Sequence, residues 1–252
     1  MLNEHEVIDA LVGKVIAAMT ARGYKERDTR SLWQIVGELR SKGVHGLSRW
    51  LREVQGRLGD REQYLDVYAQ GWFARIFTHN GLRVTMNPRG GRGPDLAVEW
   101  CQQLVYVEVG RLRPDYEERR RLEEGGPGGM LVPYGRGERD VWKLVDTIVA
   151  KSRQGKGVPE GHAYLIAIRI DKESLENDID PALVAQELEN QQSAGGAGYG
   201  KVSAVLFHYK SVSVRSPTPW QVWENPAADR PLPPGMGDRL RTMDWQVLHR
   251  GC

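Results

Sequence analysis

Two carboxylates, Asp95 and Glu108, are the residues whose type and spacing most directly indicate chemistry. Each belongs to a short, largely apolar segment that predicts a β-strand, 95–100 and 104–109, and Cys101-Gln102 lies between the two segments. If Cys101-Gln102 forms a two-residue turn, the strands pair as a hairpin in which Asp95 lies directly opposite Glu108.

The apolar residues of the two segments support this register. Leu96 would face Val107 and Val98 would face Val105, which gives one continuous apolar face, and a one-residue slip would mix the two faces. A Cys-Gln pair is not a preferred hairpin turn, so a loop longer by one or two residues is an alternative.

Directly opposed side chains lie about 4.5–5.5 Å apart at Cβ, where two like charges destabilise the pair. Two carboxylates held in this way therefore favour a compensating cation, and Mg²⁺ is typically bound by one or two carboxylates together with water and substrate phosphates. The alternative is a structural role, in which Asp95 ends a loop and Glu108 pairs with an arginine.

A basic, glycine-rich loop precedes the first carboxylate. No acidic residue occurs from Val67 to Pro94, and the loop 88–93 carries Arg89 and Arg92 between glycines that allow close backbone approach. These arginines are predicted to contact phosphate, with a flexible solvated loop as the alternative. Further cations follow at Lys143, Lys151, Arg153 and Lys156 and could extend a basic rim.

The first sixty residues read as three amphipathic helices. Apolar residues recur at helical spacing between Val7 and Met19, again after a cap at Asp28 or Thr29, and again from Leu47 to Leu58. The region is nearly balanced in charge, so we interpret it as a helical cap on the main domain, with a DNA-binding bundle as the alternative. The chain then divides into an N-terminal helical region (1–60), a core (61–215) and a proline-rich C-terminal wrap (216–252).

The core is predicted to be α/β, with a mixed sheet flanked by helices. The element order is α-β-β-β-α-β-α-β, and a Gly/Arg/Glu-rich stretch at 111–139 is an insertion or partly disordered loop. The wrap is expected to be irregular, with a short element near Trp245. The predicted elements are helices at 62–79, 140–154 and 181–192 and strands at 82–87, 95–100, 104–109, 163–170 and 202–209.

Pro94-Asp95 at a strand start, a hairpin, and Glu108 in the next apolar strand resemble the PD-(D/E)XK nuclease superfamily. The order of elements over roughly 62–209 is similar to that restriction-endonuclease-like core. The resemblance implies that Asp95 and Glu108 hold Mg²⁺ or Mn²⁺ and that an acidic residue of the first core helix, Asp66 or next Glu62, points toward the metal.

Gly110 stands where the family motif has its lysine. Some members of the family supply the lysine from the following helix, which here offers Lys143 and Lys151. Lys151 falls on the flank of the apolar stripe of that helix, about 90° from its centre, whereas Lys143 lies nearly opposite the stripe. We therefore favour Lys151, with Gln154 as the polar residue that family members often place after it. A solvated helix face is the alternative for both lysines.

Composition and motifs exclude several other classes. The chain has 252 residues with a formal net charge of +2, and no apolar run long enough for a transmembrane helix. Residues 1–10 lack the pattern of a secretory signal, and two cysteines cannot form a disulfide framework, which together favour a cytoplasmic protein. The glycine-rich stretch 195–202 nearly fits a phosphate-binding P-loop, but it ends in valine and lies between a helix and a strand in the wrong order.

The sequence thus predicts a metal-dependent nuclease, either an endonuclease or an exonuclease, which hydrolyses phosphodiester bonds in nucleic acid, with DNA favoured. The catalytic group is Asp95, Glu108, Lys151 and Gln154, the metal ligands are Asp95, Glu108 and Asp66, and the nucleic-acid contacts are Arg89, Arg92, Lys143 and Arg153. A homodimer is expected by analogy with related folds. The alternatives are a catalytically inactive nuclease-fold module that binds nucleic acid or a protein partner, favoured by Gly110, and an α/β protein of unrelated function.

Overall fold

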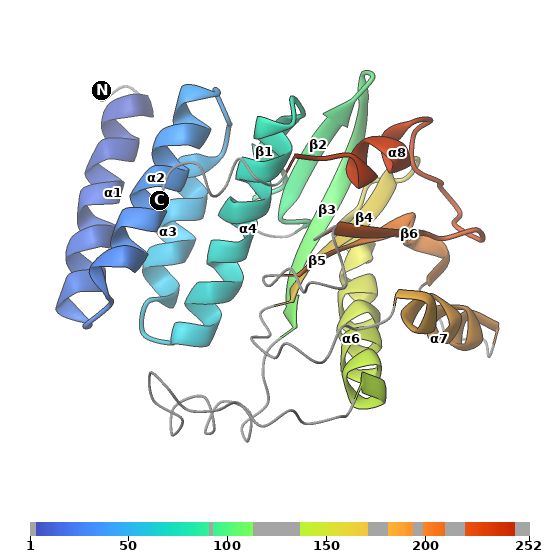
Figure 1. Cartoon of the computed structure of the whole chain (residues 1–252). Coiled ribbons are helices and arrows are strands. Elements are labelled where there is room, and N and C mark those ends of the chain that lie inside the picture. The colour runs from blue at the N-terminus through green and yellow to red at the C-terminus, as the bar shows by residue number, and fades with distance from the viewer. Residues whose placement is uncertain are drawn as a thin grey trace.

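The computed structural model describes residues 4–90, 93–112, 137–170, 181–193, 199–209 and 220–244. Within these residues the protein is a mixed α/β structure, in which a six-stranded mixed sheet is flanked by helices (Figure 1). The helices are α1 (Glu4–Ala21), α2 (Glu26–Ser41), α3 (Leu47–Arg57), α4 (Arg61–His79), α6 (Gly137–Ser152), α7 (Pro181–Ser193) and α8 (Met236–Arg241), with 3₁₀ turns η1 (Arg153–Gly157) and η2 (Tyr199–Lys201). The strands are β1 (Arg83–Met86), β2 (Leu96–Trp100), β3 (Gln103–Leu112), β4 (Ala163–Ile170), β5 (Ala204–Tyr209) and β6 (Trp220–Glu224).

The strands are ordered as they follow in the chain, from β1 to β6. The first three form an antiparallel meander, β3, β4 and β5 run parallel, and β6 returns antiparallel at the edge. The helices α6 and α7 lie in the connections between the parallel strands, as parallel pairing requires a crossover. The predicted element order of the core is therefore confirmed over the described residues.

The β2–β3 hairpin has the predicted register, with Leu96 opposite Val107 and Val98 opposite Val105. Cys101 and Gln102 form the turn at φ angles of 48° and 65°. Two positive φ values are typical of the type I′ turn, which normally prefers asparagine and glycine. The continuous apolar face therefore determines the register at the cost of an unfavourable turn.

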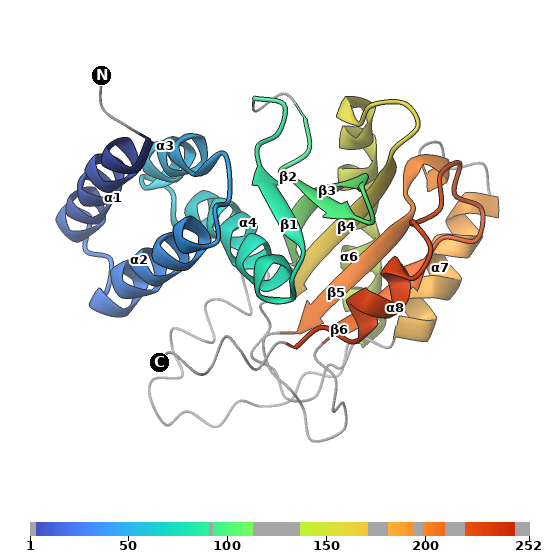
Figure 2. The ribbon, with the colours of Figure 1, turned by 90° about the horizontal axis from the view of Figure 1, so that it is seen from above.

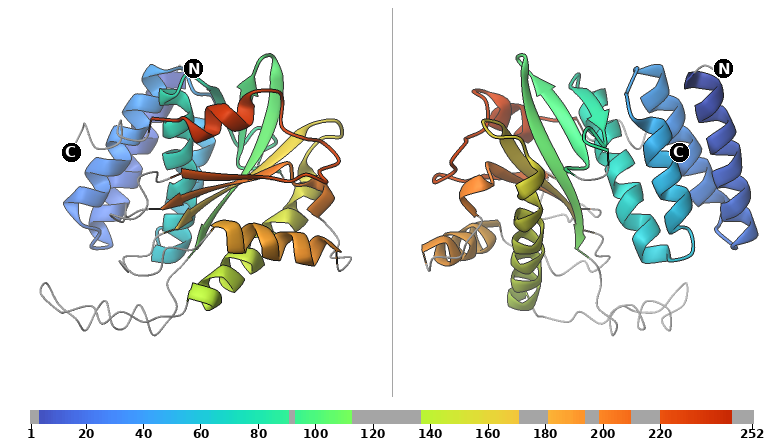
Figure 3. Two further views of the ribbon diagram at one scale, coloured as in Figure 1. Left: turned by 45° about the vertical axis from the view of Figure 1, so that its right-hand side comes forward. Right: turned by 180° about the vertical axis from the view of Figure 1, so that it is seen from behind.

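The two faces of the sheet pack against different helices. Figures 2 and 3 show α1–α4 on one side of the sheet and α6 and α7 on the other. Odd-numbered β3 residues such as Val107 belong to a core shared with α1–α4, whereas even-numbered residues such as Leu112 join the core under α6 and α7. Glu108 is even-numbered and lies on the α6 face of β3.

Helices α1–α3 share a continuous apolar core with α4 and the sheet. Trp50 of α3, which is fully buried, packs directly against Gly71 of α4. The indole Nε1 of Trp50 donates to the carbonyl of Val67 at 2.9 Å. The link before α3 also pairs with β1, where the Met86 amide donates to the His45 carbonyl at 2.9 Å.

The start of α2 differs from the sequence prediction. The N-cap of α2 is Lys25, so the predicted caps Asp28 and Thr29 were wrong and lie in the first turn, where the Thr29 hydroxyl donates to the Glu26 carbonyl at 2.8 Å. Helix α4 does begin with a side-chain cap, since Asp60 accepts from the amides of Glu62 and Gln63.

The C-terminal region contains more regular structure than predicted. Residues 220–224 form β6, an edge strand on β5, and residues 236–241 form α8, whereas an irregular wrap had been predicted. Strand β3 continues through Leu112, so the start of the predicted insertion is strand, and residues 113–136 lie outside the described residues. The element expected near Trp245 and residues 195–198 of the glycine-rich stretch also lie outside them. No helix of the described segments is both long and apolar enough to cross a membrane.

The contact between Gly71 and Trp50 predicts an effect on stability. A Cβ at Gly71 would lie 2.3 Å from Cζ2 of Trp50. We expect Gly71→Ala to lower the free energy of unfolding by about 1–3 kcal/mol through overpacking, as measured by urea denaturation. Gly13→Ala in α1 is the matched control, since a Cβ there has no neighbour within 4 Å and should stabilise the helix by about 0.5–1 kcal/mol. Equal stability of the two variants would contradict this account of the helix packing.

Candidate active site

Asp95 lies one residue before β2 and is held at three atoms. Its carbonyl accepts from the Asn87 amide at 2.7 Å. Its side chain accepts at Oδ1 from Gln70 Nε2 and at Oδ2 from the Val109 amide, both at 2.8 Å. Contacts from the β1–β2 loop, α4 and β3 thus fix the backbone and the carboxylate together.

Helix α3 braces the loop that holds Asp95. Asn87 has a left-handed φ of 46°, and its carbonyl accepts from Arg49 Nη1 at 3.0 Å. The Asn87 side-chain amide is 3.5 Å from Glu53 Oε2. Sequence analysis did not select Arg49, Glu53 or Gln70, because their polar side chains on helices carry no motif.

Glu108 lies on β3, between β2 and β4, and is 4% exposed. Lys151, in the last turn of α6, donates from Nζ to Glu108 Oε1 at 2.8 Å and lies 3.5 Å from Gln154 Oε1. The hydroxyl of Tyr164 on β4 donates to the Lys151 carbonyl at 2.8 Å, which anchors the end of α6 above the sheet.

The side chain of Lys151 passes over Gly110. A Cβ at Gly110 would lie 3.6 Å from Lys151 Cε and 3.7 Å from Cγ. The Lys151 side chain from α6 therefore occupies the space above Gly110 on β3. Lys143 lies two turns earlier on α6, about 12 Å along the helix axis. Of the two candidate lysines, only Lys151 is recorded in contact with Glu108.

Burial and neighbouring charged groups shift the pKa values of Asp95, Glu108 and Lys151. Burial and the charge of Glu108 raise the pKa of Asp95 to about 8. Burial also raises the pKa of Glu108, although the charge of Lys151 and hydrogen bonds from Lys151 and Asp95 oppose this shift. Burial lowers the pKa of Lys151, but the charges of Glu108 and Asp95 outweigh that effect and raise it. One lysine thus does not fully offset the two negative charges.

Asp66 and Glu62 meet a different partner. Arg111, on the opposite face of β3 from Glu108, has a side chain 3% exposed, with Nη1 3.3 Å from Asp66 Oδ1 and 3.6 Å from Glu62 Oε2. The charge of Asp66 still contributes to the raised pKa of Lys151. Among the described residues, no group of three acidic, histidine or cysteine side chains is arranged to hold a metal ion.

The predicted nucleic-acid contacts are spread around this centre. Arg89 donates from Nη1 to the carbonyl of Gly157 at 2.7 Å, which joins the glycine-rich loop to η1. Arg153 is exposed on η1, and Lys143 is half-buried on α6. Arg92 lies outside the described residues, as does the side chain of Lys156.

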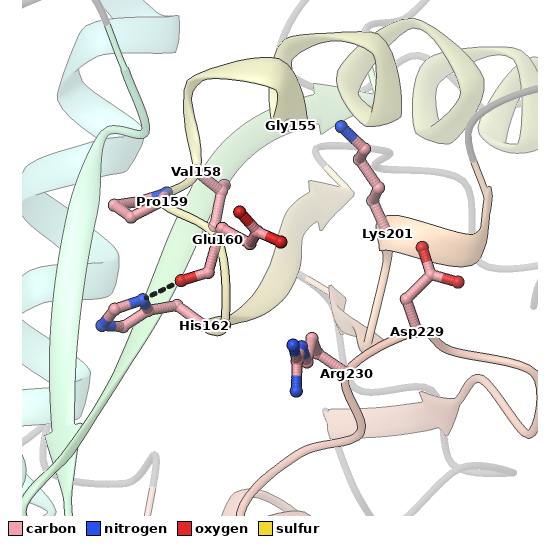
Figure 4. A pocket seen from close by; sticks show the side chains of 9 residues that line it. Gly155, Val158, Pro159, Glu160, His162, Lys201, Asp229 and Arg230 are labelled. Carbon is pink, nitrogen blue, oxygen red and sulfur yellow. Dashed lines mark hydrogen bonds between the residues drawn. The ribbon is translucent and has the colours of Figure 1, made fainter.

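A polar pocket of about 450 Å³ lies between η1, the segment that precedes β4, and the segments around η2 and after β6 (Figure 4). The ring of His162, in its wall, packs edge-on against Tyr106 of β3 with centroids 5.4 Å apart. Its charged side chains balance, with two acids and two bases, so the pocket is not an electrostatic trap for phosphate. It is lined by Gly155, Val158, Pro159, Glu160, Gly161, His162, Lys201, Asp229 and Arg230.

Comparison with known proteins gives little further identification. No protein-family model matches the sequence, and no curated protein matches it. Among solved structures, the chain is similar to one in the CdiA-CT/CdiI toxin and immunity complex from Burkholderia pseudomallei, at 13% identity and a TM-score of 0.33. The match covers 66% of this chain and 89% of that chain. Similarity at this level identifies neither a fold family nor a function.

The raised pKa of Asp95 predicts how stability depends on pH. The folded-state pKa of about 8 lies above the ordinary value of 3.8, so between these values the folded protein binds more protons than the unfolded chain. The free energy of unfolding should therefore fall as the pH rises from about 4 to about 8. Asp95→Asn removes this contribution, and Gln70 can turn its carbonyl toward the new amide.

Urea denaturation at several pH values in the presence of a chelator measures the effect. We expect a shallower decline for Asp95→Asn than for the wild type. Asp146→Asn on α6, at an exposed position, is the control and should decline like the wild type. The same decline in all three proteins would contradict the raised pKa.

Proposed function

We propose that the protein is a metal-dependent nuclease with a restriction-endonuclease-like core. The observation that carries the proposal is the contact between Lys151 Nζ and Glu108, next to Asp95, with the lysine stretched over Gly110. Metal-dependent hydrolysis of a phosphodiester requires carboxylates that bind the metal ion and a cationic group beside them, and these three residues provide both. The proposed substrate is nucleic acid, with DNA favoured.

The residues fit a divalent cation with hard oxygen ligands. Asp95 and Glu108 offer carboxylate oxygens from adjacent strands, and Mg²⁺ commonly takes only one or two carboxylates, with water and substrate phosphate completing its shell. Burial raises the pKa of both acids, so at neutral pH a divalent cation would replace the proton on Asp95 when it binds. Mn²⁺ has similar ligand preferences.

When bound, the ion would activate a water nucleophile and offset charge on the phosphoryl oxygens. The protein's own groups would orient the carboxylates and stabilise negative charge on the phosphate. The Val109 amide and Gln70 fix the Asp95 carboxylate, and the Tyr164 hydroxyl fixes the end of α6 that carries Lys151. The raised pKa of Lys151 keeps its ammonium group protonated at neutral pH, so it would stabilise charge that develops on the phosphate.

The basic residues near η1 suggest where the substrate backbone would lie. Arg89 links the glycine-rich loop to η1, and Arg153 is exposed on the same turn. A strand placed across the carboxylates could contact both. The alternative of an inactive binding module rested on Gly110, and the position of Lys151 above Gly110 weakens that reason.

A cleavage assay with Mg²⁺ or Mn²⁺ tests the proposal on plasmid, linear, single-stranded and branched DNA and on RNA. We expect metal-dependent cutting that Glu108→Ala lowers by at least about 100-fold, since the variant removes a proposed metal ligand. Glu99→Ala is the control, because this β2 residue pairs with Arg83 at the surface and should cut like the wild type. Full cutting by Glu108→Ala, with its fold retained by circular dichroism, would contradict the site.

A further inference from the structure

Gln70 is a buried polar residue that contacts the proposed centre from α4. It is 7% exposed, and its Nε2 donates to Asp95 Oδ1 at 2.8 Å. Asp66, one turn earlier on the same helix, is directed to Arg111. Helix α4 therefore contacts Asp95 through the side-chain amide of Gln70, whereas Asp66 of the same helix contacts Arg111.

The carbonyl of the same amide has no hydrogen-bond partner among the described residues. Gln70 Oε1 is buried, and no group in the described part of the chain donates to it. Buried polar atoms in native proteins are nearly always paired with protein, water or a ligand, because an unpaired buried carbonyl loses its hydration without compensation. An acceptor left in this state beside Asp95 points to a donor that comes from solvent or from a bound species.

Packing on both sides of Gln70 fixes the position of the α4 backbone relative to the site. The adjacent Gly71 packs directly on the Trp50 ring, and Trp50 donates to the Val67 carbonyl. Nε2 and Oε1 belong to the same planar amide group. Because Nε2 is held by Asp95, Oε1 must also lie close to the Asp95 carboxylate. A cation bound by Asp95 would usually keep several waters. One of these waters would be the donor that Oε1 lacks.

We propose that Gln70 is a positioning residue with two functions, an inference that rests on the proposed metal site. Its N–H group holds Asp95 Oδ1 in the orientation that leaves the carboxylate open to the cation. Its carbonyl accepts a hydrogen bond from a water molecule in the hydration shell of the cation. A residue of this kind contributes to metal affinity without being a ligand, and removing such partners typically costs about 10–100-fold in affinity.

The test measures Mn²⁺ affinity by electron paramagnetic resonance of free Mn²⁺, in the full-length protein without nucleic acid. Gln70→Leu removes both the donor and the acceptor, and we expect its dissociation constant to rise about 10–100-fold. Gln70→Glu loses the donor to Asp95 but keeps an acceptor, so we expect its dissociation constant to rise less than that of Gln70→Leu. Gln63→Leu is the control on the same helix, since the Gln63 side chain contacts Asp60 and Arg57 at the exposed start of α4 and its loss should not change the affinity.

The outcomes separate this inference from the proposed function. A wild-type protein that binds no Mn²⁺ at millimolar concentration overturns the metal site itself. Wild type and Gln70→Leu with equal affinity overturn only the role of Gln70, and a loss in Gln70→Glu as large as in Gln70→Leu overturns the water-accepting function. Circular dichroism confirms folding, and Gln70→Met provides the same test if Gln70→Leu does not fold.

Discussion

The proposed site depends on two buried carboxylates, Asp95 and Glu108, that are held next to each other. Asp95 and Glu108 repel each other when both are ionised. Burial disfavours the ionised form of each and so raises the pKa of both carboxyl groups. A purely structural strand pair would avoid this arrangement, because apolar side chains fill such a position at lower cost. The protein instead adds one lysine, one amide and one backbone N–H, which stabilise the pair without neutralising it.

Elements from distant parts of the chain maintain this arrangement. The apolar register of β2 and β3 sets the two acids on neighbouring strands, even with an unfavourable turn. Helix α3 packs on α4 at Trp50 and also holds Asn87, so the N-terminal helices fix both the loop before Asp95 and the helix that carries Gln70. On the other face, Tyr164 fixes the end of α6 and with it Lys151. The helical cap is therefore part of the site's support.

The parts of the fold and the site that follow a periodic pattern of apolar residues could be predicted from the sequence. Alternation fixed the hairpin register, and helical periodicity placed Lys151 on the flank that faces the sheet. The remaining contacts come from tertiary packing, which sequence periodicity does not encode. Gln70 and Arg49 are single polar residues whose partners lie 25 and 38 positions away. Arg111, the partner of Asp66, was assigned to an insertion because the charged stretch after it concealed the end of β3. β6 was missed because prolines precede and follow its five residues.

The most direct test of the central claim moves the lysine back to the strand. Lys151→Ala should lower metal-dependent cutting by about 100-fold or more, since it removes the cation at the carboxylate pair. The double variant Gly110→Lys/Lys151→Ala frees the space above β3 and should recover at least a tenth of the wild-type rate. Full cutting by Lys151→Ala alone would contradict the assignment of Lys151 to the centre.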